Sequence, residues 1–199
     1  TEFVSGGSLG QALANGSAWM RVPLKQKLGL LKGILKGLTF MHDRNFIHRD
    51  VKPHNILLET SPGCTALGED VIKRWMVAKI ADFGTSVTLS HGAKCHGEVG
   101  TTGYMAPEIV DPKGYDGAVD VFAFGVIGWE LFIDQSQGAK NPMVGIDPAD
   151  LFDGPRPECG LSHPSNVLVM AKRAWQGDPC KRPSFRAISS LFGINQGDL

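Results

Sequence analysis

The chain has 199 residues, enough for one domain with a sizeable hydrophobic core. Its 20 acidic and 20 basic residues balance, so charge gives no reason to expect nucleic acid or an anionic membrane as a partner. The sequence has no apolar run near the roughly 18 residues of a membrane span and no opening signal segment. We therefore expect an intracellular, cytoplasmic protein without membrane insertion.

The chain opens on "TEFVSGGSL" rather than on an initiator methionine or a signal peptide, and we interpret it as an internal or processed piece of a longer protein. Its four cysteines are scattered and form no CxxC pair, which favours reduced thiols. They are Cys64, Cys95, Cys159 and Cys180.

The first predicted elements are helical. "SLGQALANG" (8–16) predicts one or two helical turns after a glycine pair. A long helix follows with Pro23 in its first turn, and the polar "HDRN" (42–45) ends it. We interpret its apolar stripe as a core face, because leucines recur there at steps of four and three residues. The stripe consists of Leu24, Leu28, Leu31, Leu35 and Leu38.

Two short apolar runs then predict strands, "NILLE" (55–59) and "MVAKIAD" (76–82). The polar stretch between them, 60–75, is expected to be a surface excursion. Residues 83–105 are polar and rich in glycine and hydroxyl groups, which predicts a long loop. Such loops in compact domains are usually functional or mobile.

The last third of the chain predicts further helices. Residues 118–132 are apolar nearly all round, so we expect a helix buried in the middle of the domain. Residues 164–176 and 184–194 predict two more. The result is a mostly helical domain with small strands that carry polar residues at their ends.

Those polar residues suggest a chemistry. Asn55 opens one strand and Asp82 closes the other, so antiparallel pairing would bring an amide oxygen and a carboxylate together, as Mg²⁺ requires. Lys52 adds a positive charge for a phosphoryl group, and Asp50 remains to orient a hydroxyl nucleophile and accept its proton. A metal ion, a cationic side chain and a base are the groups that catalysis of phosphoryl transfer requires, because this catalysis consists mainly of positioning and charge neutralisation.

Three motifs carry a family resemblance. "HRDVKPHN" (48–55), "DFG" (82–84) and "APE" (106–108), in this order, resemble the catalytic half of a eukaryotic protein kinase. The resemblance implies an α+β, protein-kinase-like fold: a mainly helical C-terminal lobe with short β-hairpins, the N-terminal β-lobe missing. It places a hinge at 1–9 and the C-terminal lobe at 10–195. "AWQGDPCKRPSF" most resembles the tyrosine-kinase-like group, whose members phosphorylate mainly Ser and Thr.

The resemblance also implies a role for each site residue. Asp50 matches the catalytic base, and Lys52 matches the cation that contacts the transferred phosphate. Asn55 and Asp82 match the two metal ligands. Thr101 in "GTTGYMAPE" matches the threonine that bonds the catalytic loop and helps admit a Ser/Thr substrate.

For the nucleotide, the resemblance implies ATP with Mg²⁺. Leu57 matches the aliphatic floor beneath the adenine, and the backbone of Glu2 and Val4 would bond the purine edge, with Thr1 behind the pocket. The expected partner is a protein with a Ser or Thr acceptor. The sequence gives no indication of the oligomeric state.

Other matching positions have structural roles. Glu108 and Arg182 are expected to form a buried ion pair, and Asp120 to anchor the backbone of the catalytic loop. His48 and Phe83 are expected to be packing residues rather than catalytic ones.

The loop at 83–105 raises two further points. "HGAKCH" (91–96) lacks the second half of a zinc site, so we interpret it as mobile loop. The resemblance implies that Arg49, directly before Asp50, binds a phosphate on this loop through a charge-assisted pair. Candidate acceptors are Thr85, Ser86, Thr88, Ser90 and Thr102, of which Thr88, Ser90 and Thr102 are favoured.

The leading hypothesis is therefore a protein Ser/Thr kinase that transfers the ATP γ-phosphate. We expect this chain to be inactive alone, because it contains no match to the glycine-rich phosphate loop or the strand lysine. A non-catalytic, kinase-like scaffold is the alternative from another class, and the sequence upstream of Thr1 would discriminate the two. A small-molecule kinase is a third option, against which the peptide-binding segment "GTTGYMAPE" argues.

Overall fold

The structure is a computed structural model of the chain. It describes residues 4, 6–60, 76–133, 141, 143–154, 156, 163–195 and 197. Thr1, Glu2 and the polar insertion at 61–75 lie outside the described residues, as do Cys64 and Cys159.

A capping box starts the first helix, α1 (Leu9–Ala14). The Ser8 Oγ accepts a hydrogen bond from the Gln11 backbone N–H at 3.2 Å, and the Gln11 Oε1 accepts one from the Ser8 N–H at 2.9 Å. Each side chain thereby satisfies a backbone donor that a helix start leaves without a partner. The short helix α2 (Gly16–Met20) follows directly, so the helical part extends further than the expected one or two turns.

The long helix α3 (Leu24–His42) begins directly after Pro23, as expected from the leucine stripe. Leu31, Leu35 and Leu38 are fully buried, whereas Leu24 in the first turn is exposed. The stripe is therefore a core face over most of the helix.

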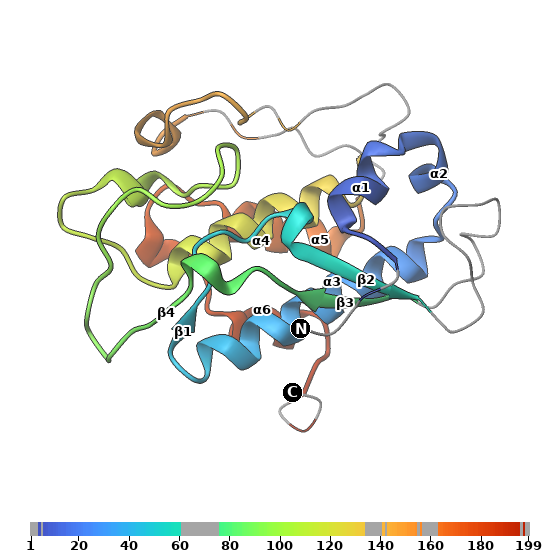
Figure 1. The fold of residues 1–199 in the computed structure, drawn as a ribbon, viewed down its shortest axis with the longest axis horizontal. Helices are drawn as coiled ribbons and strands as arrows, with labels where there is room; N and C mark the ends of the chain where they lie inside the picture. The colour runs from blue at the N-terminus through green and yellow to red at the C-terminus, as the bar shows by residue number, and fades with distance from the viewer. Residues whose placement is uncertain are drawn as a thin grey trace.

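The predicted strand pair is confirmed. β2 (Ile56–Thr60) and β3 (Met76–Ile80) run antiparallel, with Ile56 opposite Ile80. The hairpin packs on α3 (Figure 1). Gly37 permits this close approach, since a Cβ atom there would come within 2.7 Å of the Ile80 Cδ1.

A second antiparallel ribbon corrects the prediction that 83–105 is entirely loop. β1 (Phe46–Ile47) pairs with β4 (Val87–Thr88), and a 3₁₀ turn, η3 (Phe83–Thr85), precedes β4. Strands of two residues are too short to show an alternating pattern, so only the tertiary pairing reveals them.

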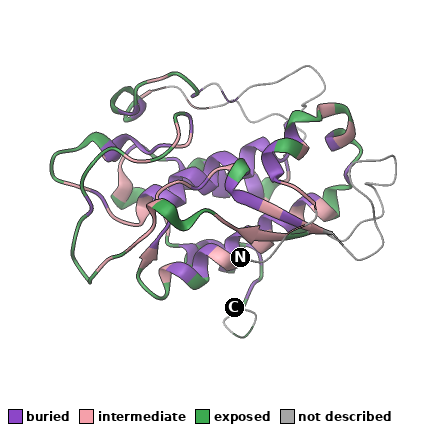
Figure 2. Cartoon of the chain, in the orientation of Figure 1, coloured by how far each residue is buried: buried purple, intermediate pink, exposed green. Residues whose placement is uncertain are grey.

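The helix α4 (Ala118–Glu130) forms the centre of the molecule, with its residues buried along almost its whole length (Figure 2). It packs against α5 (Ser165–Ala174), and α3 packs against α6 (Phe185–Leu191). A Cβ atom at Gly125 would lie 2.7 Å from the Ala174 Cβ, so α4 and α5 are in close contact there. The remaining 3₁₀ turns are η1 (Pro53–Asn55), η4 (Pro107–Val110), η5 (Pro148–Leu151) and η6 (Pro179–Lys181).

The expected α+β architecture, mainly helical with short antiparallel strands, is confirmed. Among the described residues, no helix combines the length and apolar character that crossing a bilayer demands. Cys95 is a buried free thiol and Cys180 an exposed one.

Candidate active site

The backbone that leads into Asp50 is held by a carboxylate from the central helix. Asp120, buried in the first turn of α4, accepts hydrogen bonds from the His48 and Arg49 N–H groups, both at 2.8 Å. The His42 Nε2 lies 2.9 Å from the same carboxylate. Arg49 has a φ of 68°, a conformation that residues other than glycine rarely adopt. The contacts from Asp120 therefore stabilise a strained turn, which agrees with the anchoring role expected for it.

His48 connects this turn to the end of β3. Its ring is buried, its Nδ1 accepts the Asp50 N–H at 3.3 Å, and its Nε2 lies 2.9 Å from the Ala81 carbonyl. Because a carbonyl can only accept, Nε2 carries the proton and Nδ1 does not. His48 thus has the structural role that the sequence predicted.

Phe83 packs against two rings, as expected, but it is less buried than His48. Its ring lies 5.6 Å from the His48 ring and 6.2 Å from the Phe46 ring, but 49% of the residue is exposed. This exposure agrees with its position in the η3 turn, none of whose residues is buried.

The side chain of Asp50 forms a triangle of hydrogen bonds with two other side chains. The Lys52 Nζ lies 2.8 Å from Asp50 Oδ2, and Thr101 Oγ1 donates to Asp50 Oδ1 at 2.7 Å. The third side is the bond from Lys52 Nζ to Thr101 Oγ1, also 2.7 Å. Thr101 is 51 residues from Asp50 in the sequence, so the tertiary fold alone brings these groups together.

Asn55 joins the same set from η1. Its Nδ2 donates to the Asp50 backbone carbonyl at 2.9 Å and to Asp50 Oδ2 at 3.2 Å. The Ala81 N–H donates to the Asn55 carbonyl at 2.9 Å, which places the next residue, Asp82, beside this turn. Asp82 is exposed and has a φ of 62°. Asn55 and Asp82 thus lie at the same end of the β2–β3 hairpin.

The neighbours of Asp50 control its charge. Burial by itself would raise the pKa of the Asp50 carboxyl, but the hydrogen bonds from Lys52, Thr101 and Asn55 and the charge of Lys52 outweigh it. The pKa of Asp50 therefore lies below its usual value. At neutral pH the carboxylate is ionised and can accept a hydrogen bond from a hydroxyl group.

The donor atoms at the hairpin end fit a hard cation. The Asn55 amide nitrogen is committed to Asp50, so the amide oxygen is directed away from Asp50. Asp82 supplies an exposed carboxylate nearby. Two protein oxygens of this kind suit Mg²⁺, which usually keeps several waters and is completed by phosphate oxygens.

The expected nucleotide residues are placed in part. Leu57 is half-buried on β2. The end of the expected hinge pairs with this strand, because the Leu58 N–H donates to the Gly7 carbonyl at 2.9 Å. Val4 is also half-buried. Glu2 lies outside the described residues.

The candidate phosphate acceptors near Arg49 fall into a half-buried group and an exposed group. Thr85 and Ser86 are half-buried, and their hydroxyls donate to the His48 carbonyl at 3.0 and 3.4 Å. The Arg49 Nε in turn donates to the Thr85 carbonyl at 2.6 Å. The remaining candidates are exposed: Thr88, Ser90 and Thr102.

A buried pair next to the site was not predicted from the sequence. The Tyr104 hydroxyl donates to Glu130 Oε2 at 2.7 Å. Burial raises the pKa of Glu130 to about 7, against the lowering effect of the Tyr104 bond, and burial with the nearby Glu130 raises the pKa of Tyr104. The sequence offered one signal for this pair: Glu130 lies within a run of apolar residues. An acid in a buried helix needs a hydrogen-bond partner, so a partner could have been expected.

The predicted buried ion pair is confirmed. The Arg182 guanidinium binds the Glu108 carboxylate through two hydrogen bonds of 2.5 and 2.7 Å, with the Arg182 side chain fully buried. Its other hydrogen bonds go to backbone carbonyls, those of Gln176, Gly177 and Ala118. The pair fixes η4 to the start of α4 and to the segment before α6.

Comparison with known proteins decides the family. The sequence model described as "Protein kinase domain" matches residues 1–190. The chain belongs to the protein kinase family. The predicted family and its kinase-like fold are confirmed, and protein kinases as a family use ATP and Mg²⁺ and act on proteins.

Several curated kinases are similar over nearly the whole chain. The "RGS domain-containing serine/threonine-protein kinase A" of Dictyostelium discoideum is 34% identical over 189 residues, which cover 94% of this chain and 15% of that protein. The "Serine/threonine/tyrosine-protein kinase HT1" of Arabidopsis thaliana is 32% identical over 197 residues, or 96% of this chain and 45% of that protein. The "Serine/threonine-protein kinase STY46" of the same plant is 30% identical over 193 residues, 94% and 30% respectively. The kinase chain thus spans less than half the length of each.

Proposed function

We propose that the protein containing this chain transfers the γ-phosphate of ATP to Ser or Thr hydroxyls of a protein substrate. The observation that carries the proposal is the Asp50 carboxylate, ionised and held by Lys52, Thr101 and Asn55 beside Asp82. The names of the similar kinases support the choice of Ser and Thr as acceptors.

In this proposal Asp50 orients the substrate hydroxyl and accepts its proton. Lys52 and Thr101 keep the carboxylate in one position, and Lys52 also provides a positive charge next to the transferred phosphoryl group. Positioning of this kind is the main contribution a protein makes to phosphoryl transfer.

Asn55 and Asp82 are the proposed metal ligands. A bound Mg²⁺ would neutralise phosphate charge, which is the chemistry the metal supplies. Leu57 and the backbone of Glu2 and Val4 are proposed to contact the adenine. The division into a hinge at 1–9 and a C-terminal lobe at 10–195, and a cytoplasmic location, belong to the same proposal.

The substitution Asp50→Asn tests the role of the carboxylate in the full protein. Phosphate transfer from labelled ATP to a Ser/Thr peptide is expected to fall by about 10²- to 10⁴-fold, the usual contribution of a positioned base. Asp43→Asn is the matched control, because Asp43 pairs with Arg186 at the surface, 2.7 Å apart. The proposal is wrong if Asp50→Asn, with an unchanged thermal midpoint, transfers phosphate as fast as the control.

A further inference from the structure

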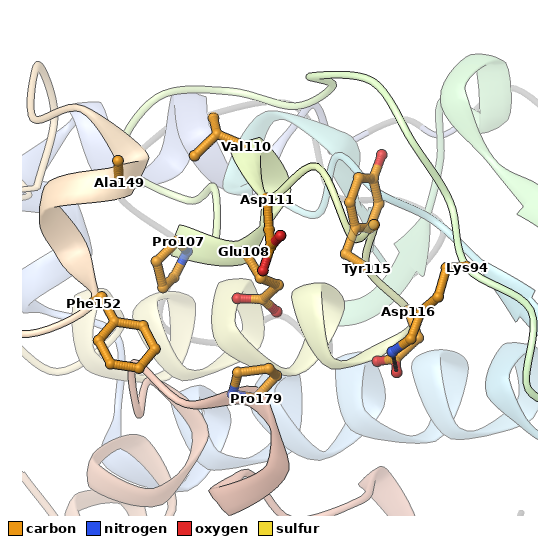
Figure 3. Close-up of a pocket in the computed structure, with 11 residues that line it drawn as sticks. Lys94, Pro107, Glu108, Val110, Asp111, Tyr115, Asp116, Ala149, Phe152 and Pro179 are labelled. Carbon is orange, nitrogen blue, oxygen red and sulfur yellow. Dashed lines mark hydrogen bonds and ion pairs between the residues drawn. The ribbon is translucent and has the colours of Figure 1, made fainter.

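A pocket of about 280 Å³ opens between three 3₁₀ turns, η4, η5 and η6, and the residues just before α4. Figure 3 shows Pro107, Phe152 and Pro179 gathered at one end and Lys94 with Asp116 at the other. We call it the η4–η5 pocket. None of the groups assigned to phosphoryl transfer lines it. It therefore belongs to a separate part of the surface.

The apolar end of the η4–η5 pocket includes large apolar side chains that are exposed. Phe152 is 53% exposed and Val110 is 38% exposed. Pro107, Ala149 and Pro179 complete this wall. Exposed apolar surface that lines a hollow is typical of a binding site rather than of an ordinary solvated face.

The surroundings of the pocket are acidic. Asp111 lines it, and Asp147 and Asp150 lie on and next to η5; all three are exposed. Residues 144–153 contain three aspartates and no lysine or arginine. Of the nearby cations among the described residues, Lys94 is paired with Asp116 and Lys181 with Asp178, and Lys113 is exposed. A partner that carries positive charge beside an apolar side chain complements this surface.

The η4–η5 pocket lies on the same stretch of chain as the proposed substrate site. Pro107 follows Thr101 by six residues, so the two lie within about 21 Å of each other even if the chain between them were fully extended. The segment that supplies Ala149 and Phe152 also borders the loop at Thr101. The Asn141 Nδ2 donates to the Gly103 carbonyl at 2.9 Å, and a Cβ atom at Gly103 would lie 2.7 Å from Val144 Cγ2.

We propose that the η4–η5 pocket docks a segment of the protein substrate in which a large apolar side chain is flanked by arginine or lysine. A spacer of six or more extended residues is long enough to join this segment to the acceptor Ser or Thr, because it can span the same 21 Å. Docking raises the local concentration of the acceptor at Asp50, so it lowers KM rather than raising kcat. This inference rests on the proposed kinase function and names the substrate class for it.

Binding is measured first, because it does not depend on catalysis. The probe is a fluorescein-labelled peptide, Gly-Arg-Leu-Phe-Arg-Gly, with Gly-Glu-Leu-Phe-Glu-Gly and Gly-Arg-Ala-Ala-Arg-Gly as controls, in fluorescence anisotropy with the full protein. Phe152→Ala is expected to weaken binding of the first peptide by about tenfold or more, the usual effect of losing an aromatic contact. Asp111→Asn should weaken it to a smaller extent.

The matched control is Phe40→Ala. Phe40 is 49% exposed on α3 and does not line the η4–η5 pocket, so its loss should leave the affinity unchanged. Equal affinities for the three peptides, or an equal effect of Phe40→Ala and Phe152→Ala, would overturn the proposal.

Turnover separates docking from the kinase function. A Ser peptide selected from a degenerate library is compared with the same peptide extended by an eight-residue Gly-Ala linker and Arg-Leu-Phe-Arg. The extension should lower KM in the wild type and not in Phe152→Ala, while the short peptide reacts equally in both. A KM unaffected by the extension refutes docking of substrate. Peptide binding without turnover of any acceptor refutes the kinase function and also the claim that the bound segment belongs to a substrate.

Discussion

Replacing Glu108 with glutamine removes the negative charge of a buried ion pair and keeps the shape of the side chain almost unchanged. The Arg182 side chain is fully buried and that of Glu108 is 9% exposed. In Glu108→Gln the guanidinium would keep its bonds to the carbonyls of Gln176, Ala118 and Gly177. Its charge would nevertheless be buried without a counter-ion.

Breaking a buried ion pair by removing one partner costs about 3–5 kcal/mol of folding free energy. Because the carbonyl bonds remain, we expect Glu108→Gln to fall near the lower end, at about 3 kcal/mol. For a chain of this size that corresponds to a fall of roughly 6–12 °C in the thermal midpoint. In urea the midpoint should move by about 1.5 M for a slope of about 2 kcal/mol per molar.

The assay is urea unfolding followed by tryptophan fluorescence, with Asp43→Asn as the control. Asp43 and Arg186 also form a close pair at 2.7 Å, but the Arg186 side chain is 52% exposed, so its loss should cost about 1 kcal/mol or less. In the double variant Glu108→Gln/Arg182→Met the uncompensated charge is gone. Its loss of stability should therefore be smaller than the sum of the single variants.

Two results would refute this reasoning. One is a Glu108→Gln variant that loses no more stability than Asp43→Asn. The other is additivity of Glu108→Gln and Arg182→Met, because two groups that interact directly and are both buried cannot contribute independently.

Three more predictions concern other parts of the site. The pKa of Glu130 in the folded chain, about 7, lies above the usual 4.5, so the stability that Glu130 contributes is present below about pH 4.5 and is lost as the pH rises through 7. Urea unfolding from pH 4.5 to 8 should show the wild type losing about 3 kcal/mol more folding free energy than Glu130→Gln. Parallel pH dependences of the two proteins would contradict this. Asp120→Ala leaves the His48 and Arg49 N–H groups without their acceptor, so thermal unfolding should show a loss of at least about 2 kcal/mol of folding free energy. Asp120→Asn should lose less, and equal losses would contradict the anchoring role of Asp120. Asp82→Asn should raise the Mg²⁺ concentration for half-maximal phosphate transfer by at least about tenfold and leave the thermal midpoint unchanged, because Asp82 is exposed and Asn tolerates its φ of 62°. An unchanged Mg²⁺ dependence would exclude Asp82 as a ligand.

The sequence by itself determined the elements that have a clear hydrophobic pattern. The leucine stripe of α3, the apolar run of α4 and the two branched runs of β2 and β3 each mark which side chains leave water, and that choice is made locally. The motifs around Asp50 and Asp82 further determined the family, because several spaced residues had to agree at once.

Only the tertiary structure decided which distant groups meet. Tyr104 reaches Glu130 across 26 residues, a contact that was not predicted from the sequence. The family resemblance implied that Thr101 bonds the catalytic loop, but only the structure shows that its partners, across 51 residues, are Asp50 and Lys52. The β1–β4 ribbon and the exposed face of Phe83 are of the same kind. Such contacts depend on how the segments packed around α4 are aligned. Many side chains from distant parts of the chain contribute to the free energy of that packing, so no single local sequence pattern predicts it.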